Sequence, residues 1–137
     1  MGEDIPERVT AFGDSARLNH RRQIELVKGR GTGTAGRYAV VVILKTPPDG
    51  MRRAAFLISR RFSLLSVERN RARRLFRETY WLLFEHLDAS WILFIPRRAI
   101  KRASQHEVQR EVEGVCRKMG ILLPASTVPT ASTEPTS

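Results

Sequence analysis

The residues of this chain that could do chemistry are arginines, and they gather in the segment Ser66–Phe84. Wound as a helix at about 100° per residue, this segment has two distinct faces. An apolar stripe typical of a core-facing helix forms one of them: Ala72, Leu75, Phe76, Thr79, Leu82 and Leu83. The opposite face carries Arg69, Asn70, Arg73, Arg74 and Arg77, with Arg71 at its edge.

This arginine face suits a polyanion. Arg69, Arg73 and Arg77 stack at i, i+4 and i+8 with no acid between them, an arrangement that repels itself unless an anion lies against it. A planar guanidinium can hold two phosphate oxygens at once. Asn70 can both donate and accept, which suits a base edge or a ribose hydroxyl. The alternative is a basic helix that is merely solvated.

The charge balance of the whole chain favours the same kind of partner. Its 137 residues carry a net charge of +10, with a pI near 11.1. Between Met51 and Glu78 there are nine arginines and only two acids. Such a chain is expected to bind nucleic acid or an anionic membrane surface, with an affinity that falls steeply with salt. No apolar run is long enough to span a membrane, and no secretion signal is recognisable, so we expect no membrane partner.

The sequence offers no catalytic constellation. The histidines His20, His86 and His106 lie on separate elements, and no cysteine and histidine cluster has zinc-ligand spacing. Acids are few, and Glu68 and Glu78 lie among arginines, where ion pairing explains them. The lone cysteine, Cys116, fits a reducing compartment, and we expect a cytoplasmic protein. The chemistry expected of these side chains is therefore binding.

The first half of the chain predicts a helix and two strands. Arg17–Lys28 has the periodicity of a short helix, and the glycine-rich stretch 29–36 is expected to be a flexible connector rather than a nucleotide loop. Tyr38–Lys45 predicts a buried strand, and a turn follows at Pro47–Gly50. Arg52–Ser59 then predicts a second strand, antiparallel to the first across that turn.

The second half predicts the arginine helix, a third strand and a last helix. Ser66 is the expected cap of the arginine helix, and Trp91–Pro96 is the third strand. Ser104 and Glu107 form a capping box that opens the last helix, whose apolar stripe includes Cys116 and which Gly120 ends.

These elements indicate an α+β protein, a small α/β sandwich with helices packed on one mostly antiparallel sheet. We expect one nucleic-acid-binding domain over residues 17–122. Residues 1–16 and the Pro/Ser/Thr-rich tail 123–137 are expected to be disordered.

The run Arg69–Glu78 resembles the signature of the bacterial ribonuclease P protein component, an Arg-Asn-Arg run on a helix followed by further basic residues. Ile58–Arg61 resembles that family's strand end before the helix, and Trp91–Arg98 resembles its apolar strand ending in basic residues. The similarity covers residues 17–119. It implies a ribosomal S5 domain 2-like fold with a left-handed βαβ crossover at the arginine helix.

The resemblance also implies a function. The chain would be the protein subunit of ribonuclease P, an endoribonuclease that removes the 5′ leader of precursor tRNA. Its partners would be ribonuclease P RNA and precursor tRNA, with no small-molecule substrate. The RNA would be the catalyst, with no protein catalytic residues, and magnesium would be bound mainly by the RNA subunit and the substrate.

Two sets of site residues follow from the resemblance. The residues implied to face the RNA subunit are Arg60, Arg61, Arg69, Asn70, Arg71, Arg73, Arg74 and Arg77. Those implied to line a cleft for the single-stranded leader are Ile24, Val27, Lys28, Val42, Arg97 and Arg98. The family often has aromatic residues where this chain has Ile24, Lys28 and Val42. Apolar contact could replace stacking at Ile24, whereas Lys28 indicates a more electrostatic cleft.

Two other classes of function fit the charge. A structural RNA-binding protein of the ribosomal type would share the basic surface without promoting cleavage. A DNA-binding domain could place the arginine helix in the major groove, although only Asn70 on that face is suited to reading a base edge.

Overall fold

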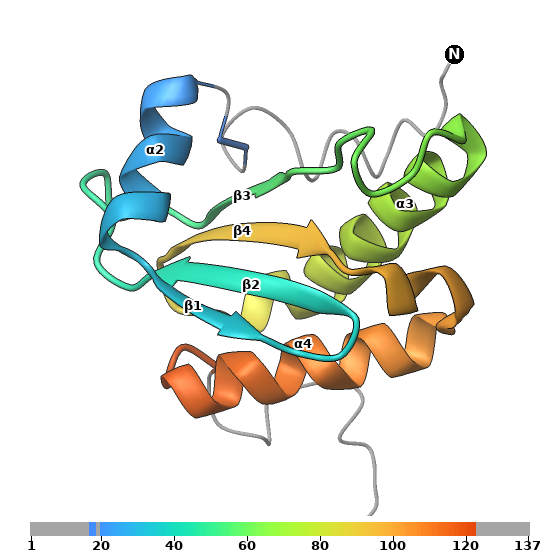
Figure 1. Ribbon diagram of the computed structural model, residues 1–137. Helices are drawn as coiled ribbons and strands as arrows, with labels where there is room; N and C mark the ends of the chain where they lie inside the picture. Colours follow the sequence, from blue (N-terminus) through green and yellow to red (C-terminus); the bar gives the residue numbers. More distant parts are fainter. Residues whose placement is uncertain (1–16, 19, 123–137) are drawn as a thin grey trace, which may run out of the picture.

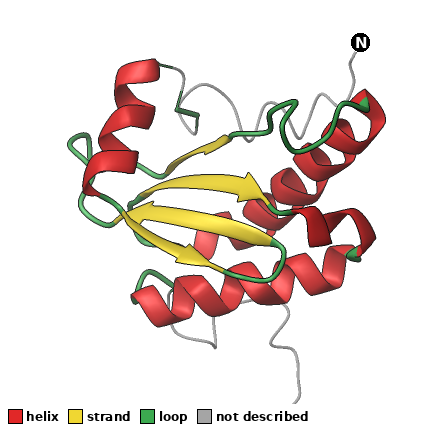
Figure 2. Ribbon diagram, viewed as in Figure 1, coloured by secondary structure: helices red, strands yellow, loops and turns green. Residues whose placement is uncertain are grey.

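A computed structural model describes residues 17, 18 and 20–122 of the chain, and the segments 1–16 and 123–137, expected to be disordered, lie outside them (Figure 1). The elements in order are α2 Arg21–Arg30, β1 Thr32–Ala35, β2 Ala39–Leu44, β3 Arg53–Phe56, α3 Ser66–Leu83, η2 Phe84–His86, β4 Trp91–Pro96, η3 Arg98–Arg102 and α4 Gln105–Met119. Helices α2, α3 and α4 lie around one sheet (Figure 2). The predicted α+β class, with helices on a mostly antiparallel sheet, is confirmed.

The four strands lie in the order β1-β2-β4-β3. The pairs β1–β2 and β2–β4 are antiparallel, with Val41 opposite Phe94, whereas β3 runs parallel to β4. The central strands β2 and β4 pack on both faces of the sheet, which explains why their sequences are apolar almost throughout.

The predicted pairing of the second strand with the first is wrong. Arg53–Phe56 is shorter than expected and pairs with β4, which is inserted between it and β2. The turn after β2 does reverse the chain, but β4 is buried on both faces and takes the position beside β2. Because β3 and β4 are parallel, α3 is the crossover that joins them.

The glycine-rich stretch is also not a flexible connector. Thr32–Ala35 within it forms β1, an edge strand paired along its length with β2. Its small side chains give no period-2 pattern, so the backbone pairing leaves little trace in the sequence. Gly31 has no room for a side chain, because a Cβ there would lie 2.5 Å from the carbonyl oxygen of Val27.

The sheet has a core on each face. Helices α3 and α4 cover one face, where Phe76 and Tyr80 pack against Phe94. Helix α2 covers part of the other face, where Val27 packs with Leu93 in a smaller cluster (Figure 1). No helix in the described residues is long and apolar enough to cross a membrane.

The turn between β2 and β3 forms as predicted. The Gly50 amide donates to the Pro47 carbonyl at 3.1 Å, and Gly50 has a φ of 66°. The Asp49 carboxylate accepts hydrogen bonds from Arg53 Nε at 2.6 Å and Trp91 Nε1 at 3.0 Å. Burial raises the pKa of the Asp49 carboxyl, but its hydrogen bonds together outweigh burial and hold that pKa below its ordinary value.

The helix ends agree with the sequence at α4 and differ at the other two helices. Ser104 Oγ accepts from the Glu107 amide at 3.1 Å, and Gly120 adopts the left-handed conformation with a φ of 79°. Helix α3, in contrast, is capped at Leu65 rather than at Ser66. Helix α2 begins only at Arg21, because Arg17 forms a bridge to β3.

Candidate nucleic-acid interface

The two faces of α3 are arranged as its periodicity predicts. The buried residues of the helix are Ala72, Leu75, Phe76, Thr79, Tyr80 and Leu83. Leu82, which was expected in the apolar stripe, is only half-buried, and Tyr80, which was not, is buried. On the opposite face, Asn70 and Arg74 are exposed, and Arg69, Arg73 and Arg77 are half-buried. The guanidinium groups therefore project from one side of a helix whose other side is anchored in the core.

Two arginines of this segment are held by backbone carbonyls of the protein itself. Arg71 donates to the carbonyls of Ile100 at 3.1 Å and Ala103 at 2.5 Å, which ties α3 to η3. Arg69 donates to the carbonyl of Ser63 at 2.9 Å and so fixes the loop before the helix. Arg71 thus has a role inside the fold that the helical wheel could not reveal.

Asn70 and Arg73 are coupled on the exposed face. Arg73 donates to the Asn70 side-chain oxygen at 3.2 Å, so that oxygen is engaged, and the Asn70 amide nitrogen can act only as a donor. Arg73 also lines a hollow between α2 and β3. The pair places a hydrogen-bond donor among the positive charges.

The acid at the start of α3 is neutralised locally. Glu68 accepts from Ser63 Oγ at 2.5 Å and pairs with Lys101 Nζ at 3.3 Å. The hydrogen bond from Ser63, together with Lys101, lowers the pKa of the Glu68 carboxyl. The ion pairing expected for Glu68 is present, but its partner is a lysine of η3 rather than an arginine of the helix.

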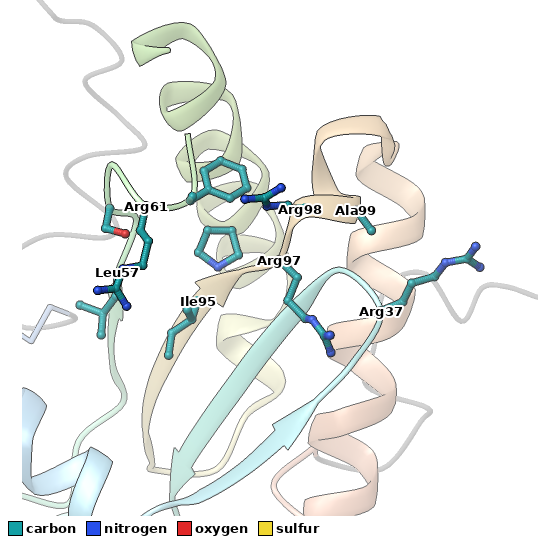
Figure 3. A pocket seen from close by; sticks show the side chains of 10 residues that line it. Arg37, Leu57, Arg61, Ile95, Arg97, Arg98 and Ala99 are labelled. Atoms are coloured by element: carbon teal, nitrogen blue, oxygen red, sulfur yellow. The ribbon is translucent and has the colours of Figure 1, made fainter. Parts of the chain in front are cut away.

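A second basic surface lies at the end of the sheet (Figure 3). Here a hollow of about 480 Å³ has Arg37, Arg61, Arg97 and Arg98 around it and Leu57, Phe62, Ile95 and Pro96 among its lining residues. Arg61 comes from the loop after β3, whereas Arg97 and Arg98 follow β4 (Figure 3). Apolar contacts surrounded by cations suit a strand of nucleic acid whose bases are unpaired.

A glutamate braces one wall of this hollow. Glu111 on α4 accepts from the backbone amides of Arg37 at 2.7 Å and of Tyr38 and Ala39 at 3.0 Å each. Arg97 reaches the same hairpin, donating to the Gly36 carbonyl at 2.9 Å. Glu111 was not among the predicted site residues, because a glutamate on an amphipathic helix gives no sign of a backbone partner more than seventy residues away.

The six residues implied for a leader cleft do not share one hollow. Ile24 lines a hollow of about 250 Å³ between α2 and β3, while Arg97 and Arg98 line the hollow at the sheet end. Val27 is fully buried and Val42 packs partly beside it. Lys28 is exposed on α2. Leu57, the residue after β3, lines both hollows, and only its place in the apolar run of the predicted strand Arg52–Ser59 could have indicated it.

No three His, Cys, Asp or Glu side chains within the described part of the chain are grouped so that they could hold a metal ion. The one cysteine, Cys116, is a buried core residue, and burial raises the pKa of its thiol to about 12.

The fold and its charged surfaces define a small basic α+β domain with an arginine-rich crossover helix. Residues 12–120 match the ribonuclease P family. The ribonuclease P protein component of Symbiobacterium thermophilum is 32% identical over 107 residues, covering 77% of this chain and 92% of that protein. The chain therefore belongs to the ribonuclease P protein family.

Relatives at lower identity agree. The ribonuclease P protein component of Caldanaerobacter subterraneus subsp. tengcongensis is 28% identical, covering 74% of this chain and 87% of that protein. The RNase P protein of Staphylococcus aureus has the same fold at 21% identity, with a TM-score of 0.70 over 80% of this chain and 99% of that one. The Thermotoga maritima protein gives 0.64 at 22% identity, covering 74% and 96%.

Proposed function

We propose that this chain is the protein subunit of ribonuclease P, binding the catalytic RNA subunit and the 5′ leader of precursor tRNA and promoting endonucleolytic removal of that leader. The RNA breaks the phosphodiester bond, and magnesium is held mainly by the RNA and the substrate. The protein works in the cytoplasm. Membership of the family over residues 12–120 is the observation that carries this proposal.

The RNA subunit lies against the exposed face of α3. Arg69, Arg73, Arg74 and Arg77 neutralise its phosphates there, and Arg60 and Arg61 extend the same positive surface from the exposed loop before the helix. Asn70 offers its amide nitrogen to a base edge or a ribose. Arg71 contributes charge to this surface while its guanidinium holds η3.

The leader follows the face of the sheet that α2 partly covers, opposite the face covered by α3 and α4. The hollow at the sheet end offers Leu57 and Ile95 for apolar contact with bases, and Arg61, Arg97 and Arg98 for phosphates. Ile24 lies on α2 and Val42 on β2, with Lys28 exposed on that helix and Val27 as its buried anchor. The leader is therefore held by cations and aliphatic side chains.

Reconstitution tests the proposal. The full chain is added to ribonuclease P RNA at low magnesium, and cleavage of precursor tRNA is followed. We expect the protein to stimulate cleavage by the RNA and to cleave nothing alone. Binding without stimulation would instead favour a structural RNA-binding protein, and a preference for duplex DNA would favour a DNA-binding domain.

Leader recognition has its own test. Arg98→Ala removes one exposed charge from the sheet-end hollow and leaves the residues assigned to the RNA subunit unchanged. We expect weaker binding of precursor tRNA with a long leader and unchanged binding of a substrate with a single leader nucleotide. Equal losses on both substrates would contradict the assignment of that hollow to the leader.

A further inference from the structure

The large apolar side chains that stay exposed are concentrated at one helix. Among the described residues they are Met51, Leu64, Leu65, Val67 and Trp81, and all but Met51 belong to α3 or to the two residues before it. Leu64 is 79% exposed and Val67 is 71% exposed. Clusters of exposed apolar residues mark interaction sites more often than scattered ones do.

Trp81 lies on the arginine face. At about 100° per residue, it is about 20° from both Asn70 and Arg74 around the helix axis, directly opposite the buried stripe. Val67 lies about 40° from Trp81 and about 21 Å from it along the axis. The exposed face of α3 is thus a strip with Val67 at one end, arginines in the middle and Trp81 at the other end.

The arrangement of arginines between two apolar ends restricts what kind of RNA can lie on the strip. The arginines require phosphates, so the partner is a polyanion rather than an apolar protein surface. A continuous A-form duplex presents phosphates and riboses, and its bases are stacked and paired inside. An indole ring against such a surface would meet no apolar partner, whereas an unpaired base offers a flat face to stack on.

We infer that the exposed face of α3 binds RNA at a place where nucleotides are unpaired, with one nucleobase stacked on Trp81 and apolar contacts to Leu64, Leu65 and Val67 at the opposite end. Arg73, Arg74 and Arg77 hold the phosphates between these ends. The inference rests on the proposed function, because it specifies the form of the RNA that the arginine face binds.

Substitution at Trp81 separates stacking from charge. Trp81→Ala should weaken binding of the full chain to ribonuclease P RNA by about 5- to 150-fold, the range for loss of one stacked base. Because no charge is removed, the slope of log affinity against log salt should not change. Trp81→Phe keeps an aromatic face and should recover most of the affinity. Leu64→Ser with Leu65→Ser should weaken binding in the same salt-independent way.

Controls separate this effect from loss of structure. Met51→Ala removes the exposed apolar side chain that lies away from α3, and it should bind as the unchanged protein does. Thermal unfolding of each variant shows whether the fold is kept. Trp81 fluorescence gives a second readout: RNA should quench it in the unchanged protein, and the quench should disappear in Trp81→Phe, which retains only the buried Trp91.

The outcomes distinguish the inference from the proposed function. If Arg74→Ala weakens binding but Trp81→Ala does not, and no quench occurs, the arginine face binds a continuous duplex and the inference is wrong. If Trp81→Ala also lowers the salt slope, the residue acts through the arginines, and stacking is likewise excluded. If neither Arg74→Ala nor Trp81→Ala alters RNA binding, the proposed interface itself fails.

Discussion

The brace formed by Glu111 offers the sharpest test of how this fold positions its basic surfaces. Glu111→Gln keeps the size and shape of the side chain but removes its charge and one acceptor oxygen. The carboxylate accepts from three successive backbone amides, those of Arg37, Tyr38 and Ala39. Gly36 is confined by the same group, because a Cβ there would collide with the Glu111 carboxylate.

The expected cost follows from these hydrogen bonds. Hydrogen bonds to a charged group contribute about 1.5–3 kcal/mol each. The Arg37 amide is exposed and can be hydrated, whereas those of Tyr38 and Ala39 are partly buried. Weakening these two bonds should lower the free energy of unfolding by about 3 kcal/mol. For a domain of this size, that corresponds to a Tm lower by on the order of 10–20 °C.

Thermal and urea unfolding followed by circular dichroism measure this loss. Glu113→Gln is the matched control, two positions along the same helix, where the carboxylate forms an ion pair with Arg117 at 2.9 Å. A pair of that kind contributes about 0.3–0.5 kcal/mol, so this variant should unfold close to the unchanged protein. If Glu111→Gln were no more destabilising than Glu113→Gln, the brace would not hold the hairpin and our reasoning would be wrong.

Three further predictions concern charge, the thiol and pH. The double variant Arg73→Ala, Arg74→Ala should reduce the slope of log RNA affinity against log salt concentration by about 1.4–1.8. Arg110→Ala, on the exposed side of α4, should leave that slope unchanged. Equal slopes for the two variants would count against α3 as the interface. Cys116 should resist alkylation at pH 8 until the protein unfolds, because a thiol with a pKa of about 12 forms almost no thiolate. Cys116→Ser should have a lower Tm than the unchanged protein, and below that Tm it should leave leader cleavage intact. The pKa of the Asp49 carboxyl is lowered in the fold. Its stabilising contribution is therefore present above about pH 3.9 and is lost as pH falls through the folded pKa. In urea titrations, the difference in free energy of unfolding between the unchanged protein and Asp49→Asn should shrink on acidification from pH 7 to pH 3.

The sequence was most informative where periodicity and local capping determine the structure. The two faces of α3, the central strands and the capping box at Ser104 all follow from patterns within a few residues. Strand pairing depends instead on which strand is apolar on both faces and must be enclosed. For this reason β4 lies between β2 and β3, and the predicted antiparallel hairpin of β2 and β3 does not form. The edge strand β1 consists of small residues, and its place is set by the backbone of β2.

The sequence predicted which arginines of α3 share a face, but not the contacts that they make within the fold. Helical spacing placed Arg69, Arg73, Arg74 and Arg77 on one face. It could not show that Arg71 is held by carbonyls thirty residues away, since such partners depend on the tertiary fold. Residues at the ends of separate strands, such as Leu57 and Arg37, meet only once the sheet has formed, and no pattern along the chain connects them.

Under the proposed function, these internal contacts would let two basic surfaces act on one RNA complex. Arg71 fastens α3 to η3, Arg97 fastens the end of β4 to the β1–β2 hairpin, and Glu111 fastens that hairpin to α4. In each contact, a charged side chain forms hydrogen bonds with backbone groups. These charge-assisted hydrogen bonds are stronger than neutral ones and have a defined direction. The arginine face and the sheet-end hollow are therefore held at a fixed separation, which is what a protein needs if it is to contact the catalytic RNA and the leader of its substrate together.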